Sequence, residues 1–128
     1  MESFYLLVGF GCLLIIILAI NVSRLRYKER IAHGSRDNKK LRNAIIAHSN
    51  ALEQTIPFCL IIFVLISQDT ASTTIQFLVI SFIIMRLIHA VGITMFIYRA
   101  WQISSGFSYL LTIFSSCLIL YNLAVANV

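Results

Sequence analysis

Four long apolar segments, separated by short polar stretches, dominate the chain. They run from Phe4 to Val22, Ala44 to Ile66, Thr74 to Tyr98 and Phe107 to Val125. Each segment is close to or longer than the ~20 residues that an α-helix needs to cross the hydrocarbon core of a bilayer. Because the second and third connections are short, neighbouring helices must run antiparallel. The pattern therefore predicts an all-α fold, an integral membrane four-helix up-down bundle.

Local signals set the expected helix boundaries within a single domain, residues 1–128. The polar turn at residues 33–38 separates the first two helices, and helix-forming composition returns at Lys39. We expect helices over residues 4–26, 39–67, 73–98 and 105–126. The first segment does not resemble a cleavable signal peptide, because Glu2 precedes it and the basic residues follow it. It is expected to remain as a membrane anchor.

Composition and charge support a membrane protein and indicate its orientation. The chain is 59% hydrophobic and 12% charged, whereas soluble domains are about 25% charged. The net charge of +5 does not indicate a nucleic acid partner, because eight of the ten Lys and Arg residues lie in residues 24–42. By the positive-inside rule this connection faces the cytoplasm, and both termini lie on the other side. Most of these charges suit cytoplasmic retention and attraction to anionic lipid.

Two of the basic residues suit a ligand as well. Arg24 and Arg26 lie at the end of the first predicted helix, where they can reach inward and meet the carboxylates of an anionic ligand. The cysteines offer no comparable site, because Cys12, Cys59 and Cys117 are widely spaced in apolar runs. A thiol there behaves as a small hydrophobe. We therefore expect neither a metal site nor a disulfide framework.

The second apolar segment contains polar residues at helical spacing. Ile46, Asn50, Glu53 and Pro57 fall on one stripe of a helix with ~100° per residue. Glu53 lies eleven residues after Arg42, or about 16 Å deeper at ~1.5 Å per residue. A charged side chain at that depth costs roughly 2.5 to 3.5 kcal/mol on insertion scales. Glu53 therefore needs a partner.

The third apolar segment supplies a candidate partner at a similar depth. Arg86 lies thirteen residues before the more superficial Arg99, or about 20 Å along its helix, and His89 shares its face. We predict that this face meets the Glu53 stripe, within a subunit or across a subunit interface. One interpretation is an ion pair that fixes helix register and assembly. The other is the floor of a cytoplasm-facing polar site with Asn50 and His89 in its walls.

Three short motifs together resemble the MAPEG family, the membrane-associated proteins in eicosanoid and glutathione metabolism. They are RLR at residues 24–26, AHSNALE at residues 47–53 followed by IPF at residues 56–58, and RLIHAVG at residues 86–92. Their order and spacing extend the resemblance over almost the whole chain. The basic turn and the third motif look most like small bacterial members resembling microsomal glutathione transferases, which would place the protein in a bacterial inner membrane.

The resemblance implies a homotrimer that binds glutathione between neighbouring subunits. It also implies transfer of the glutathione thiolate to a lipophilic electrophile, or reduction of a lipid hydroperoxide. Carried over by position, Arg24, Asn50 and Glu53 would hold the tripeptide. Arg86 and His89 would shape the site from the third helix. The resemblance also implies a role for Arg99, which lies close to where relatives place an arginine that stabilises the thiolate.

Two departures from the family pattern keep a second function open. Ile46 stands where relatives usually have an arginine, and Ile93 stands where many have a tyrosine. Catalysis would then depend on the remaining positive charge to lower the pKa of the glutathione thiol. The alternative is a non-catalytic binding or scaffold protein with membrane lipid, another anionic thiol or a membrane protein as its partner. A proton-coupled transporter is a weaker third option, since no repeated half is visible.

Overall fold

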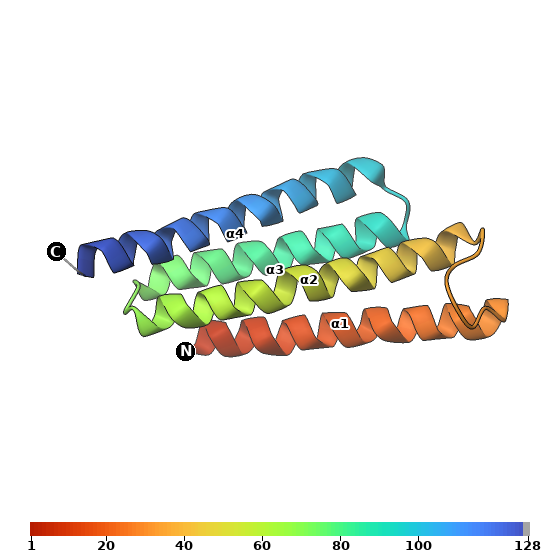
Figure 1. Ribbon diagram of the computed structural model, residues 1–128, viewed down its shortest axis with the longest axis horizontal. Coiled ribbons are helices and arrows are strands. Elements are labelled where there is room, and N and C mark those ends of the chain that lie inside the picture. Colours follow the sequence, from red (N-terminus) through yellow and green to blue (C-terminus); the bar gives the residue numbers. More distant parts are fainter. Residues whose placement is uncertain (127–128) are drawn as a thin grey trace.

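The computed structural model describes residues 1–126, which form four helices joined by three short connections. They are α1 (Glu2–Glu29), α2 (Lys39–Ser67), α3 (Ser72–Thr94) and α4 (Tyr98–Ala126). Successive helices run antiparallel, so the start of α1 and the end of α4 lie beside the α2–α3 connection (Figure 1). All four helices are long and apolar enough to cross a membrane. The predicted all-α bundle of four membrane spans is confirmed.

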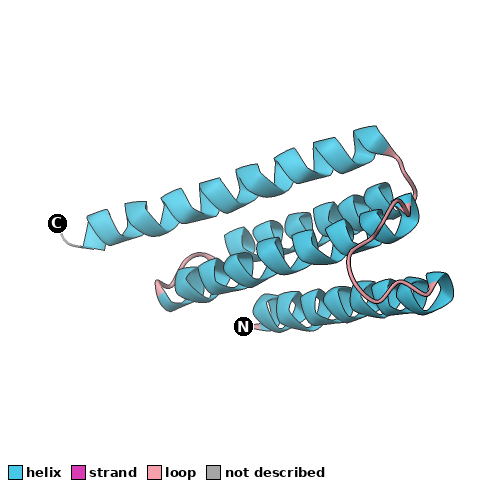
Figure 2. Cartoon of the chain, turned by 45° about the vertical axis from the view of Figure 1, so that its right-hand side comes forward, coloured by secondary structure: helices cyan, strands magenta, loops and turns pink. Residues whose placement is uncertain are grey.

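The central pair of helices separates the two outer ones. α1 packs on α2 and α3, and α4 packs on α3 and α2, but α1 and α4 do not contact each other within residues 1–126. Figure 2 shows α4 and α1 on opposite sides of the central pair. The apolar window of α3 is the most buried, and those of α1 and α4 are the least buried. A single chain therefore presents the outer faces of α1 and α4 to lipid or to other protein.

Aromatic and small residues make the central helix contacts. Phe58 of α2 stacks on Phe82 of α3, with ring centroids 3.8 Å apart and an angle of 8° between the planes. Nearer the α1–α2 connection, α3 approaches α4 closely at Gly92. A Cβ there would lie 2.8 Å from the backbone nitrogen of Trp101. Small residues at such points let helix backbones approach within a membrane.

Three helices end in the same left-handed turn, and none of these turns uses glycine. In each turn, the amide of a residue with positive φ donates to the carbonyl of the residue three positions earlier. The amide of the next residue donates to the carbonyl of the residue five positions before it. This is the Schellman motif, which usually has Gly or Asn at the left-handed position. The left-handed residues here are Arg30 after α1, Asp69 after α2 and Phe96 after α3, with φ of 52°, 53° and 60°.

The Phe96 turn corrects the expected boundaries of the last two helices. We predicted a third helix to residue 98 and a fourth from residue 105, whereas α3 ends at Thr94 and α4 begins at Tyr98. The amide of Ile97 bonds the Gly92 carbonyl at 2.8 Å and closes the turn. Because no proline or left-handed glycine marks this position, the apolar pattern alone placed the connection too late.

Candidate functional site

A buried polar centre lies between α3 and α4, and we define it as Arg86, His89, Ser104, Ser105 and Ser108. The Arg86 side chain is 3% exposed. Its Nη2 donates to Ser108 Oγ at 3.0 Å, and its Nη1 donates to the Asn50 carbonyl of α2 at 3.4 Å. Its guanidinium carbon also lies 5.8 Å from the centroid of the Phe82 ring. These three contacts within the described residues are all made to neutral groups.

His89 occupies the same centre one helical turn further along α3. Its side chain is 2% exposed. Its Nδ1 lies 3.0 Å from Ser105 Oγ and 3.5 Å from Ser104 Oγ. Ser104 donates its hydroxyl to the Ala100 carbonyl at 2.7 Å, so Ser105 is the hydroxyl that has the hydrogen free for the imidazole. The serines of α4 thus orient both basic side chains of α3.

Three buried polar atoms have no hydrogen-bond partner in the described residues: Thr55 Oγ1, Arg86 Nε and His89 Nε2. Two of these residues, Thr55 and Arg86, line one small cavity where α1, α2 and α3 meet. Its volume of about 10 Å³ is at the lower limit of the space that can hold one water molecule. Buried polar atoms without partners are rare in folded proteins, so we expect one water molecule here to bridge Thr55 and Arg86.

The predicted ion pair between Glu53 and Arg86 does not form within the chain. Arg86 is enclosed by α2, α3 and α4, whereas Glu53 is exposed on α2. Glu53 has no hydrogen bond or ion pair to any of residues 1–126. The buried face of α2 instead presents small or apolar residues and Thr55 to the core. The physical reason is the rotation of α2, which turns Glu53 away from α3.

The polar stripe of α2 lies along the edge of the bundle. Ile46 and Asn50 are half-buried, whereas Glu53 and Pro57 are exposed. The Asn50 side chain donates to the Ile46 carbonyl at 3.1 Å, and its own carbonyl accepts from Arg86. Asn50 therefore connects the exposed stripe to the buried polar centre. Ile93, the second departure from the family pattern, is 1% exposed and belongs to the apolar core.

Arg24 lies in a separate cavity near the α1–α2 connection. Its Nη2 donates to Asn21 Oδ1 at 3.2 Å. The cavity is about 330 Å³ and opens between α1, the start of α2 and the end of α3. Arg24 and Lys40 line it together with Thr94. The two cations at its wall can bind a carboxylate or phosphate.

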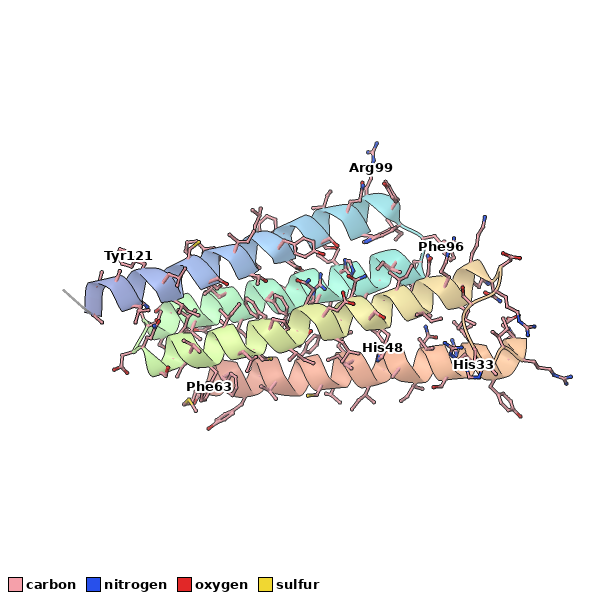
Figure 3. All side chains as sticks on the ribbon, in the orientation of Figure 1. His33, His48, Phe63, Phe96, Arg99 and Tyr121 are labelled. Carbon is pink, nitrogen blue, oxygen red and sulfur yellow. The ribbon has the colours of Figure 1, made fainter. Side chains whose placement is uncertain are left out.

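Arg26 and Arg99 lie away from that cavity. The Arg26 Nη1 donates to the carbonyls of Ala32 and Gly34, both at 3.1 Å, so its side chain follows the connection. Arg99 is exposed near the start of α4 and projects away from the bundle (Figure 3). Within one chain the predicted site residues therefore do not converge. They occupy the buried centre, the stripe of α2, the Arg24 cavity and the outer surface.

Sequence reasoning missed the partners that α4 provides. Ser104, Ser108 and Ser115 are buried on one face of α4, and each donates its hydroxyl to the carbonyl four residues earlier. The spacing of these serines at helical intervals was visible in the sequence. Small hydroxyl residues at such spacing are typical of helix contacts within membranes.

The donor set shows no metal-binding arrangement in the part of the chain that the structure describes. No three side chains of His, Cys, Asp or Glu among residues 1–126 lie close enough to hold a metal ion. Cys12 and Cys117 are exposed on helices, and Cys59 is half-buried.

The four apolar helices and the polar groups at membrane depth define an integral multi-pass membrane protein of the four-helix class. Residues 4–125 match the sequence pattern of the MAPEG family. The chain therefore belongs to this family of membrane enzymes, which is associated with glutathione and commonly uses it. No curated protein shows significant similarity to the chain. The family resemblance in the three sequence motifs is thus confirmed.

Proposed function

We propose that the protein is a membrane-bound, glutathione-dependent transferase or peroxidase that acts on lipophilic electrophiles or lipid hydroperoxides. The observation that carries the proposal is Glu53, an exposed carboxylate at mid-span with no partner among residues 1–126. Ionisable residues at such depth face a functional cavity or another protein segment. Membership of a family that commonly uses glutathione supplies the ligand.

A homotrimer would give Glu53 the environment that a single chain lacks. Facing lipid, the carboxylate costs roughly 2.5 to 3.5 kcal/mol. An interface along the polar stripe of α2 would replace lipid with protein, and the exposed outer faces of α1 and α4 would supply apolar contact area. In that interface Glu53 would bind the ligand's ammonium group or an arginine of a neighbouring subunit.

The ligand would approach through the Arg24 cavity. Arg24 and Lys40 present positive charge there, which suits the two carboxylates of glutathione. Asn50 and Glu53 would hold the part of the tripeptide that reaches deeper along α2. Arg86 and His89 are too deeply buried to touch a ligand at this edge, so we assign them a positioning role. Through the Asn50 carbonyl, Arg86 fixes the stretch of α2 that carries the site.

Positive charge near the ligand would activate its sulfur, because the thiolate is the nucleophile. In the transferase reaction the thiolate forms a C–S bond as the leaving group departs. In the peroxidase reaction it attacks the O–O bond, yielding an alcohol and a glutathione sulfenic acid, which a second glutathione converts to the disulfide with release of water. We propose Arg99 as the catalytic cation that stabilises the thiolate, and Arg26 as a further cation near the ligand. Both would act across the interface between subunits.

The proposed orientation places the basic connection in the cytoplasm and both termini on the opposite side. The excess of Lys and Arg in residues 24–42 supports it through the positive-inside rule. Glutathione would then arrive from the cytoplasm, and apolar substrate would enter from the bilayer. The resemblance of the basic turn and the third motif to small bacterial members of the family is the reason we propose an inner-membrane location.

The test is binding and turnover by the purified protein in lipid nanodiscs. Calorimetry should detect glutathione binding, and an activated aryl halide or cumene hydroperoxide should be consumed in proportion to protein. Glu53→Gln should weaken binding at least tenfold, because a charge-assisted hydrogen bond is lost. Asp69→Asn, a matched acid-to-amide change in the α2–α3 connection, should not. Absence of both binding and turnover in the wild-type protein would refute the proposal.

The second candidate is a non-catalytic binding or scaffold protein on the same fold. Ile46 favours it, because a half-buried isoleucine occupies the place of a ligand-binding arginine in relatives. Ile46→Arg separates the two functions. A gain in glutathione affinity of tenfold or more without turnover would favour the scaffold, whereas wild-type turnover would exclude it.

A further inference from the structure

A second cavity with cationic walls adjoins the site proposed above and shares only Arg26 with it. It is about 690 Å³ in volume and is formed by the last turn of α1 and the segment that follows. The lining residues are Arg26, Tyr27, Lys28, Arg30, Ile31 and Ala32. Three of these six side chains are cationic and none is acidic. The cavity is therefore an anion-binding environment distinct from the stripe of α2.

Local hydrogen bonds hold this cavity in one shape. The Ile31 amide bonds the Arg26 carbonyl at 3.1 Å and closes the Schellman turn. The Ile31 side chain is buried, which anchors the segment to the bundle as the motif requires. Arg26 Nη1 also donates hydrogen bonds to the carbonyls of Ala32 and Gly34, which hold the segment after α1 against the helix. The remaining guanidinium nitrogens of Arg26 have no hydrogen bond in the described chain and can bind a ligand.

The backbone at Arg30 carries strain that a glycine would not. A left-handed conformation is unfavourable for a residue with a Cβ atom, and Arg30 adopts it with φ 52°. Strained backbone often accompanies functional sites. Here the strain places a third cation, with Arg26 and Lys28, on the wall of the same cavity.

The cavity begins within the lipid headgroup layer and extends past its outer edge. The first apolar segment ends at Val22, and the cationic residues follow it by four to eight positions, or about 6 to 12 Å at ~1.5 Å per residue. The headgroup layer extends about 5 to 8 Å beyond the hydrocarbon core on each side. Tyr27, on the same turn, is 90% exposed, and tyrosine is enriched at this level of membranes.

We infer that this cavity binds the phosphodiester headgroup of an anionic phospholipid. Net positive charge selects an anionic headgroup over a zwitterionic one, and the position beside the hydrocarbon core selects a lipid over a soluble anion. The two acidic residues of the connection, Glu29 and Asp37, do not line the cavity. The site would anchor the end of α1 at the membrane surface, mainly through Lys28 and Arg30, which lie outside the proposed glutathione site.

The test compares two charge-matched double variants in nanodiscs of phosphatidylcholine containing 0 or about 30% phosphatidylglycerol. Lys28→Gln/Arg30→Gln removes two cavity cations and leaves Arg26 in place. Lys39→Gln/Arg42→Gln removes the same charge from exposed positions of the nearby segment that do not line the cavity. Native mass spectrometry measures retained phosphatidylglycerol per chain across a titration of the lipid.

We expect the cavity variant to weaken phosphatidylglycerol retention about 30-fold, since each basic group near a membrane surface contributes about 1 kcal/mol, or roughly fivefold. The control variant should change it less than about threefold. Equal losses in both variants would show general surface attraction and overturn the site. Displacement of the lipid by millimolar inorganic phosphate would overturn the lipid assignment in favour of a soluble anion.

A third variant separates binding from folding. Arg30→Gly removes one cation while relieving the left-handed backbone. We expect about fivefold weaker phosphatidylglycerol retention together with unchanged or higher thermal stability in pure phosphatidylcholine. Unchanged retention in this folded variant would show that Arg30 takes no part in binding and would overturn its assignment.

Discussion

At the scale of single residues, Arg86 shows how far the sequence alone could be interpreted. Its depth and its association with His89 were predictable from spacing along the third segment. Its partners were not, because the rotation of α2 relative to α3 depends on packing of the whole bundle. Ser108 and the Asn50 carbonyl accept hydrogen bonds from it. Both are uncharged, so the sequence does not mark them as partners of an arginine. Arg86 and His89 were thus predictable as polar residues at depth, but their contacts were not.

Removal of the Glu53 charge should leave the subunit fold intact. Because Glu53 has no partner within residues 1–126, Glu53→Gln should change unfolding stability of the separated subunit by less than about 0.5 kcal/mol, as for surface substitutions. Denaturant unfolding in detergent, monitored by circular dichroism, measures this change. A loss of 3 kcal/mol or more in the subunit would indicate a buried ion pair after all.

Thr55 provides a test for water in the small cavity beside Arg86. We expect Thr55→Val to destabilise the protein by about 1 to 3 kcal/mol. The bridging water would lose its hydrogen bond to the threonine hydroxyl, and its contact with Arg86 Nε would weaken. Thr55→Ser keeps the hydroxyl and is the matched control for its hydrogen bond. Thermal unfolding in detergent measures both. Stabilisation by valine would instead show a dry cavity with an unsatisfied hydroxyl.

At the scale of helices, the apolar segments were sufficient to predict the number and order of elements. They were not sufficient for the boundary between α3 and α4. Phe96 takes the left-handed position that glycine usually occupies, and neither Ile97 nor Tyr98, where α4 begins, is a residue type that marks a helix start. Close approach of the α3 and α4 backbones determines where the chain turns, and this contact spans two separate segments.

The α3–α4 contact should tolerate no side chain at Gly92. A Cβ there would lie 2.8 Å from a backbone nitrogen of α4, so the helices must move apart. We expect Gly92→Ala to cost about 1 to 3 kcal/mol, the usual cost of overpacking, measured as a lower unfolding midpoint. Gly106→Ala is the control, because a Cβ at Gly106 meets nothing within 4 Å. Similar losses in both variants would contradict close packing at Gly92.

At the scale of the whole molecule, the arrangement of helices favours assembly. α1 and α4 lie on opposite sides of the central pair and make no contact with each other in the described chain, so much apolar surface remains outside the subunit. The polar stripe of α2 lies at an exposed edge. Both features were only partly predictable, because the sequence indicates which residues are apolar but not which face of each helix remains uncovered.

We expect the purified protein to assemble as a trimer of the 14.5 kDa chain. Native mass spectrometry from nanodiscs measures the assembly directly. Glu53→Lys places a like charge near the proposed cations of a neighbouring subunit and should shift the population toward monomer. A wild-type monomer, or a trimer that Glu53→Lys leaves unchanged, would contradict an interface along the stripe of α2.

The repeated left-handed turns have an electrical consequence for the membrane. The turn after α1 presents Arg30 at one membrane surface, and the turn after α2 presents Asp69 at the other. In the proposed orientation, a membrane potential that is negative inside attracts the first charge and repels the second. Inverting the chain would move each charge against the field at about 2.3 kcal/mol per 100 mV. The same left-handed turn thus places opposite charges at the two membrane surfaces, and the membrane potential stabilises the proposed topology.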